Sequence, residues 1–259
     1  MNPTTPPLQP PPPLPPQPVL QPQPVLQGIA LSKSFGSTRA LDAVDIAVHA
    51  GESVAVMGPS GSGKSTLLHC LANIERPDSG QVLLNGERTD QLREPHRSEL
   101  RRIRFGFVFQ FGQLLPELPA VENIALPLML GGTPRREAER HARAWFAPLG
   151  LDGKEDSRPG ELSGGQAQRV ALARALVAGA EVVFADEPTG ALDRTTGQEV
   201  IRLLVKVTKA QNAALVVVTH DESVARWCDR TVRVEDGRIV EEAEETHTRV
   251  SVTETGARR

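Results

Sequence analysis

The chain has 259 residues, enough for one large domain or two small ones with a sizeable core. Its composition, with 39% hydrophobic and 24% charged residues, is ordinary for a globular protein. A net charge of −3 argues against general attraction to nucleic acid or anionic lipid. Two well-separated cysteines, Cys70 and Cys228, make neither a disulfide framework nor a zinc site. No apolar run approaches the ~18 residues that a membrane span needs, and the N-terminus lacks the pattern of a signal peptide. We therefore expect a cytoplasmic chain that reaches a membrane only through a partner.

The two ends of the chain are predicted to lie outside the folded domain. Residues 1–24 are mostly proline, glutamine and leucine, and proline fixes φ and cannot donate a hydrogen bond. We expect this tail to be disordered and to sample polyproline II, either as an inert extension or as a ligand for a proline-binding module. Residues 242–259 are predicted to be a polar C-terminal tail.

Strands and helices alternate along residues 25–241, which we expect to form one domain. The predicted strands lie at residues 25–31, 40–48, 53–57, 105–109, 181–185 and 213–219. The predicted helices lie at residues 65–72, 135–146, 163–177, 195–209 and 222–228, and residues 117–149 are helical in character as a whole. A hairpin around Asp236-Gly237 closes the domain. This order predicts an α/β fold with a largely parallel sheet.

A phosphate-binding loop is predicted between the strand at 53–57 and the helix that follows it. The run Gly58-Pro-Ser-Gly-Ser-Gly-Lys-Ser65 fits G-x-x-x-x-G-K-[ST] in the structural context that this motif requires. Backbone amides in the loop and at the helix N-terminus can point at phosphate oxygens, Lys64 adds a positive charge, and Ser65 can place its hydroxyl on Mg²⁺. The candidate nucleotide-binding residues here are Gly58, Pro59, Ser60, Gly61, Ser62, Gly63, Lys64, Ser65 and Thr66.

Two carboxylates follow the apolar strand at 181–185. Asp186 and Glu187 come at its C-terminal end, where α/β sheets bind ligands. Asp186 can hold magnesium through water, and Glu187 can act as the general base that polarises the attacking water. By itself this pair of carboxylates is moderate evidence for a nucleotide-hydrolysing site, and together with the phosphate loop it is strong evidence.

A second anion-binding helix end is predicted at Leu162-Ser-Gly-Gly-Gln166, which continues as Ala-Gln-Arg-Val-Ala-Leu-Ala-Arg174. Ser163 can cap the helix and leave the amides of Gly164 and Gly165 free for an anion. Through this signature motif the chain resembles the ABC ATPase family over about residues 25–241. The resemblance implies a P-loop NTPase core, an antiparallel β subdomain, a helical subdomain at about 111–178 and a head-to-tail homodimer that sandwiches two ATP molecules. The signature residues that would contact the nucleotide of the other subunit are Ser163, Gly164, Gly165 and Gln166.

The resemblance assigns further roles residue by residue. Gln110 matches the glutamine that completes the magnesium shell and reports site occupancy to the helical subdomain. Asp193 lies in the match to the D-loop at the dimer interface, and His220 matches the switch histidine near the γ-phosphate. Phe35 stands where the family places an aromatic residue, usually tyrosine, that stacks on adenine. Because Phe35 lacks the hydroxyl, the preference for adenine is expected to be slightly looser.

The type of ABC protein follows from what the chain lacks. The gap between Ser65 and Ser163 is too short for the coiled coils of chromosome-maintenance members, no zinc-binding cysteines mark a repair protein, and only one cassette is present. A soluble ABC ATPase that acts on nucleic acid is therefore the weaker alternative. We expect a transporter ATPase with a separately encoded membrane permease, held through it on the inner face of the membrane.

The segments 107–127 and 186–193 resemble the lipoprotein-release, macrolide-export and antimicrobial-peptide-resistance branch, whose permeases are of the large-ectodomain, four-span type. The ATPase of a polar amino-acid importer is the remaining alternative. The segment after Gln110, up to Ile124, mixes apolar residues with few charges and is predicted to dock the permease.

Overall fold

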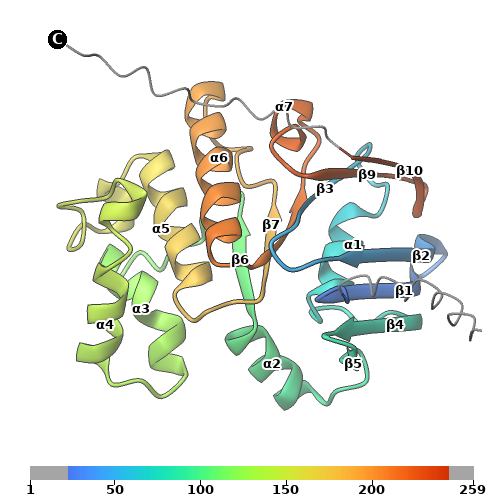
Figure 1. Ribbon diagram of the computed structural model, residues 1–259, viewed down its shortest axis with the longest axis horizontal. Coiled ribbons are helices and arrows are strands. Elements are labelled where there is room, and N and C mark those ends of the chain that lie inside the picture. The colour runs from blue at the N-terminus through green and yellow to red at the C-terminus, as the bar shows by residue number, and fades with distance from the viewer. Residues whose placement is uncertain (1–22, 245–259) are drawn as a thin grey trace, which may run out of the picture.

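A six-stranded sheet in the order β10-β9-β3-β8-β7-β6 forms the centre of the computed structural model, which describes residues 23–244 (Figure 1). The parallel strands are β9 (Arg230–Glu235), β3 (Ser53–Met57), β8 (Ala214–Val218), β7 (Val182–Asp186) and β6 (Phe105–Phe109). β10 (Arg238–Glu244) pairs antiparallel with β9 around Asp236 and Gly237, whose φ values of 47° and 76° are those that a two-residue hairpin requires. The predicted parallel sheet and closing hairpin are confirmed.

The central strands are buried on both faces, as their continuous apolar runs predict. Leu215 and Val217 of β8 belong to one hydrophobic cluster, whereas Val216 and Val218 belong to another on the opposite face. α1 (Lys64–Leu71) packs into the second cluster. α5 (Gly164–Leu176) and α6 (Arg194–Ala210) pack into the first. The sheet is therefore a layer between helices, with its C-terminal strand ends left for a ligand.

Two smaller units flank this core (Figure 1). On one side, β2 (Thr38–Val48), β1 (Leu26–Phe35), β4 (Ser79–Leu84) and β5 (Glu87–Arg88) form an antiparallel sheet in that order. On the other side, Figure 1 shows α3 (Ala120–Leu130) and α4 (Arg135–Arg143) beside α5, with short 3-10 turns at Ala147–Leu149 and Pro159–Glu161. α7 (Glu222–Ala225) follows β8. No helix among residues 23–244 is both long and apolar enough to cross a bilayer.

Three elements were not predicted from the sequence, namely β4, β5 and α2 (Glu94–Ile103). The sequence of α2 is EPHRSELRRI, and Arg97 is its one buried residue, so it carries no apolar periodicity that would mark a helix. β4 begins with Ser79 and Gly80, which favour turns. These segments are recognisable only by what they pack against.

Some boundaries also differ from expectation. α4 ends at Arg143, short of the predicted 146. β10 extends to Glu244, past residue 241, where we placed the end of the domain. The tail predictions for residues 1–22 and 245–259 lie outside the described residues.

Candidate nucleotide site

The phosphate loop is wedged between β2 and the β9–β10 hairpin. A Cβ atom at Gly58 would lie 2.0 Å from the carbonyl oxygen of Val234, and one at Gly63 would lie 2.2 Å from that of Ala40. Both glycines also have positive φ, at 144° and 107°, so no other residue fits either position without movement. The amide of Gly237 donates to the carbonyl oxygen of Ser62 at 2.9 Å, which fixes the middle of the loop.

The N-terminal end of α1 lacks a side-chain cap. Gly63 is its N-cap residue and supplies no hydrogen bond, so the first N–H groups of the helix remain open to a ligand. Lys64 reaches back along the loop, and its Nζ donates to the carbonyl oxygen of Pro59 at 2.7 Å. The Ser62 hydroxyl is buried and has no partner among the described residues. These unsatisfied donors and the positive end of the helix dipole suit an anion.

A cavity of about 600 Å³ opens over this helix end. The C-terminal ends of β7 and β8 supply its opposite wall, as expected for an α/β sheet. Nearly the whole predicted loop lines it, apart from Ser62. The lining residues are Ala40, Gly58, Pro59, Ser60, Gly61, Gly63, Lys64, Ser65, Thr66, Asp186, Glu187, Val218 and His220.

Asp186 lies at the end of β7 between the loop and the neighbouring carboxylate. Burial raises the pKa of Asp186, and the negative charge of Glu187 raises it further. His69, a hydrogen bond from Ser65 and the charge of Lys64 act in the opposite direction. A partly buried carboxylate beside a hydroxyl is a pair of oxygen ligands suited to Mg²⁺.

Glu187 and His220 form a pair at the mouth of the cavity. The His220 Nδ1 atom lies 2.7 Å from Glu187 Oε1, and Thr219 Oγ1 lies 3.5 Å from Glu187 Oε2. Glu187 has a positive φ of 46°, a strained conformation for a residue with a side chain, and its amide donates to the Val218 carbonyl oxygen at 2.9 Å. Parallel pairing of β7 and β8 thus brings together two residues that are far apart in the sequence.

Gln110 follows β6 but does not line the cavity in this structure. Its side-chain amide lies against Gly190, where a Cβ atom would be 2.8 Å from Gln110 Nε2. A residue that we did not single out, Gln168, supports this region from α5. Its Nε2 atom donates to the carbonyl oxygens of Phe109 and Pro188, at 2.7 and 2.6 Å. Gln168 thus links the backbone just before Gln110 to the backbone just after Glu187. In the sequence, only the position of Gln168 in the extended signature run could have suggested this bridging role.

The signature residues form a capped helix end that does not line the cavity of their own chain. The Gln166 amide donates to Ser163 Oγ at 3.2 Å, and the Ser163 amide donates to Gln166 Oε1 at 2.9 Å, which is a capping box. A Cβ atom at Gly165 would lie 2.5 Å from Thr196 Cγ2, so this helix end packs closely on the start of α6. Asp193 caps α6 through the amides of Thr195 and Thr196, at 3.0 and 3.1 Å.

Phe35 ends β1 at a turn and is 51% exposed. It pairs with Thr38 across that turn, and Ala40 further along β2 lines the cavity. Phe35 therefore lies in the hairpin beside the cavity and does not line it.

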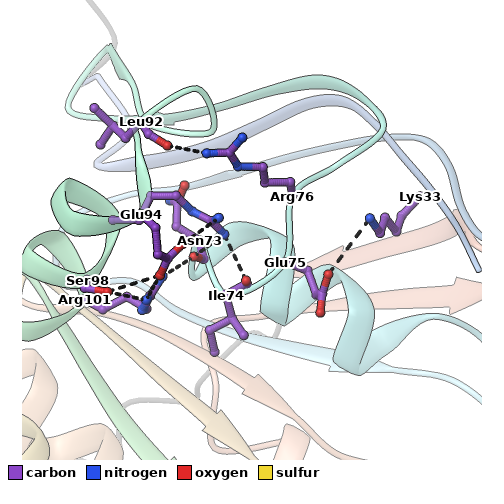
Figure 2. Close-up of polar contacts among 10 residues, drawn as sticks. Lys33, Asn73, Ile74, Glu75, Arg76, Leu92, Glu94, Ser98 and Arg101 are labelled. Carbon is purple, nitrogen blue, oxygen red and sulfur yellow. Dashed lines mark hydrogen bonds and ion pairs between the residues drawn. The ribbon is translucent and has the colours of Figure 1, made fainter.

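The C-terminal end of α1 is held by α2 (Figure 2). Arg97 donates to the carbonyl oxygens of Asn73 and Ile74, at 2.6 and 2.9 Å, and Arg101 donates to that of Asn73 at 2.6 Å. Glu94 pairs with both arginines, at 3.0 and 2.5 Å. We call these three residues of α2 the arginine clamp. It fixes the turn that ends the phosphate-loop helix.

Comparison with known proteins agrees with this geometry. Residues 41–190 match the ABC transporter family. The chain is 46% identical over 216 residues to the macrolide export ATP-binding/permease protein MacB of Burkholderia lata, covering 83% of this chain and 31% of that protein. It is 45% identical over 214 residues to the lipoprotein-releasing system ATP-binding protein LolD of Geobacter metallireducens, covering 81% of this chain and 95% of that one. The chain thus spans about a third of its MacB relatives and nearly all of its LolD relatives.

Solved structures agree as well. A dimeric, post-hydrolysis structure of the ATP-binding cassette MJ0796, bound to ADP and Pi, matches with a TM-score of 0.76 at 36% identity and covers 85% of this chain and 98% of that one. CbiO1 of Clostridium perfringens, part of the ABC transporter complex cbiONQ, matches with a TM-score of 0.79 at 27% identity, covering 86% and 89%. The predicted fold and the predicted export and lipoprotein-release branch are confirmed. The chain therefore belongs to the ABC transporter family.

Proposed function

We propose that this cassette hydrolyses MgATP to drive export or extraction of a substrate through a membrane permease made as a separate chain. The observation that carries the proposal is the cavity in which an uncapped phosphate-loop helix faces the Glu187–His220 pair. LolD is named as the ATP-binding protein of a releasing system, and this chain covers nearly all of its length. Through such a permease the cassette would sit on the inner face of the membrane.

The site residues divide into those that bind phosphate and those that act on water. The loop amides and Lys64 hold the β- and γ-phosphates, and Thr66 reaches the α-phosphate. Glu187 is the general base, and His220, within hydrogen-bonding distance of it, orients it beside the γ-phosphate. Gln110 would have to leave Gly190 to reach the phosphates, which fits a sensor of site occupancy.

The residues present fit a magnesium ion that arrives with the nucleotide. Among residues 23–244 no group of three or more His, Cys, Asp and Glu side chains could hold a metal. Ser65 and Asp186 would therefore need phosphate oxygens to complete the octahedral set that Mg²⁺ requires, with Gln110 as a further candidate. Bound in this way, the ion would neutralise charge on the transferring phosphoryl group.

A second copy of the chain supplies the signature residues in this proposal. Ser163 and Gly164 are exposed and take no part in their own chain's cavity, although the capped helix end is suited to an anion. A heterodimer with Lys64→Ala in one chain and Ser163→Arg in the other should damage one composite site twice and retain the second. Placing both changes on one chain should damage both sites. Equal activity of the two arrangements would refute the trans site.

The permease is proposed to dock on a groove of about 550 Å³ beside β6. Its apolar lining includes Phe107, Phe109, Leu126 and Leu130. The expected docking surface at residues 110–124 is only partly open, because Phe111 and Leu115 are exposed whereas Val121 and Ile124 are buried in the core. An apolar groove rimmed by charge suits an amphipathic helix.

The experiment expresses the cassette in its own host and tests co-purification of a membrane permease, using the variant Leu126→Asp/Leu130→Asp. Val240→Asp is the matched control, because Val240 is also exposed but lies on β10, at the opposite edge of the sheet. We expect the groove variant to lose the permease and the permease-stimulated ATPase activity while its basal hydrolysis survives. Unchanged co-purification would contradict the docking proposal, and absence of hydrolysis in the wild-type cassette would contradict the function itself.

A further inference from the structure

Lys33 covers one face of the Phe35 ring. Its Nζ atom lies 5.4 Å from the ring centroid, within the range of a cation–π contact. The two residues are two positions apart on β1, so their side chains leave the same face of the strand. Phe35 is nevertheless 51% exposed, which leaves the remainder of the ring open to solvent.

Lys33 is itself held in place by the segment that connects α1 to β4. Its Nζ atom lies 3.2 Å from Asp78 Oδ1 and 4.0 Å from Glu75 Oε2, and its side chain is only 14% exposed (Figure 2 draws the contact with Glu75). Asp78 also accepts a hydrogen bond of 2.7 Å from the amide of Ser34, between Lys33 and Phe35. The ammonium group is thus fixed relative to the backbone on which the ring stands.

We propose that Lys33 is a positioning residue for nucleotide binding, which holds the Phe35 ring with one face against its ammonium and the other face free for the purine base. The inference rests on the proposed function, ATP binding at this site, and on the role that the family resemblance implies for Phe35, which is to stack on adenine. It adds a residue that contacts no nucleotide and acts only through the ring.

The physical reason is preorganisation. Phe35 ends its strand beside an exposed turn, where few neighbours restrict its χ1 angle, and immobilising such a side chain on binding reduces affinity. A cation on one face also draws electron density from the ring, which lessens the repulsion between the negative faces of two stacked π-systems. A contact of this kind at an exposed site corresponds to about two- to fivefold in affinity.

The test is equilibrium binding of a non-hydrolysable ATP analogue, with inorganic tripolyphosphate as the base-free ligand. Lys33→Met keeps the aliphatic stem and removes the charge. Arg39→Met is the matched control. Arg39 lies opposite Ser34 on β2, and its replacement by Met removes an equal charge from the same hairpin. We expect Lys33→Met to weaken the ATP analogue about two- to fivefold and to leave tripolyphosphate unchanged, whereas Arg39→Met should treat both ligands alike.

Phe35→Leu completes the test. If Lys33 acts through the ring, Lys33→Met should add no further loss in a Phe35→Leu background. Equal weakening of both ligands by Lys33→Met, or a full additional loss in that background, would overturn the proposal, since Lys33 would then act by charge or folding. Failure of the wild-type cassette to bind the ATP analogue would instead refute the proposed function. Melting temperatures of all variants report folding separately.

Discussion

The two ends of α1 are built in opposite ways. At the N-terminal end Gly63 offers no cap, and the helix opens onto the nucleotide cavity with its first N–H groups available. Just past the C-terminal end, Arg97 and Arg101 donate to the carbonyl oxygen of Asn73, and Arg97 donates to that of Ile74. Asn73 Nδ2 in turn donates to Thr89 Oγ1 at 2.8 Å. One helix therefore has an end whose polar groups await a ligand and an end whose polar groups are already paired.

The difference between the two ends of α1 separates the groups that serve ligand binding from those that serve stability. Unpaired donors lower stability and create affinity for an anion, and a strained residue such as Glu187 persists only where the surrounding structure holds it. The paired end anchors α1 to α2, and α2 in turn contacts β6. Changes at the open end should therefore remove activity with little loss of stability, and changes at the clamped end should do the reverse.

The largest expected effect is that of Glu187→Gln. The amide keeps the shape of the side chain and removes the base, so turnover should fall by about 10²- to 10⁴-fold. ATP should still bind, and the melting temperature should stay close to that of the wild type. Steady-state phosphate release, with nucleotide binding measured in parallel, checks this. Hydrolysis near the wild-type rate would mean that Glu187 is not the base.

At the clamped end, Arg97→Ala should cost stability. The Arg97 side chain is only 6% exposed, and its loss leaves two carbonyl oxygens and Glu94 short of a charged donor. We expect the free energy of unfolding to fall by about 2–4 kcal/mol. Urea denaturation measures this, with Arg93→Ala as control, because Arg93 is an exposed residue at the start of the same helix. A loss of unfolding free energy no larger than that of Arg93→Ala would show that the arginine clamp does not stabilise the fold.

Arg101→Met should have a smaller effect, about 0.5–1.5 kcal/mol, because its side chain is 22% exposed and Arg97 still serves Asn73. The double variant with Arg97→Ala should lose more than the sum of the single changes, because only then does the Asn73 carbonyl oxygen lose both charged donors. Strict additivity in urea denaturation would show that the two arginines act independently.

Asp186→Asn should give the smallest shift, and in the stabilising direction. Because the folded-state pKa of Asp186 lies above the ordinary value of 3.8, ionisation of Asp186 costs stability as pH rises through these values. Without nucleotide, the variant should melt slightly above the wild type at pH 7, and the difference should vanish in acid, where the Asp186 carboxyl is protonated in both the folded and the unfolded state. Thermal melts across this pH range test the sign. A variant that is less stable at pH 7 would show that Asp186 is held by attractive charges.

The antiparallel sheet and α2 mark the limit of prediction from sequence. Central strands can be predicted from continuous apolar runs, because a strand buried on both faces carries almost no polar residues. α2 is charged along its length, and its role depends on Arg97 reaching carbonyl groups that lie far back in the chain. Its helical state follows from tertiary contacts, which no local pattern contains.

The sequence by itself determined the phosphate loop, the signature helix cap and the parallel core, because each depends on residues that are neighbours in the chain or on a simple period. Only the tertiary structure decided the 2.7 Å contact of Glu187 with His220, the position of Gln110 against Gly190, and the Lys33 ammonium on the Phe35 ring. The first two depend on how strands β6, β7 and β8 align. The third depends on Asp78, which holds Lys33 from the segment between α1 and β4. Local motifs specify which groups are available, and the packing of distant segments specifies which of them meet.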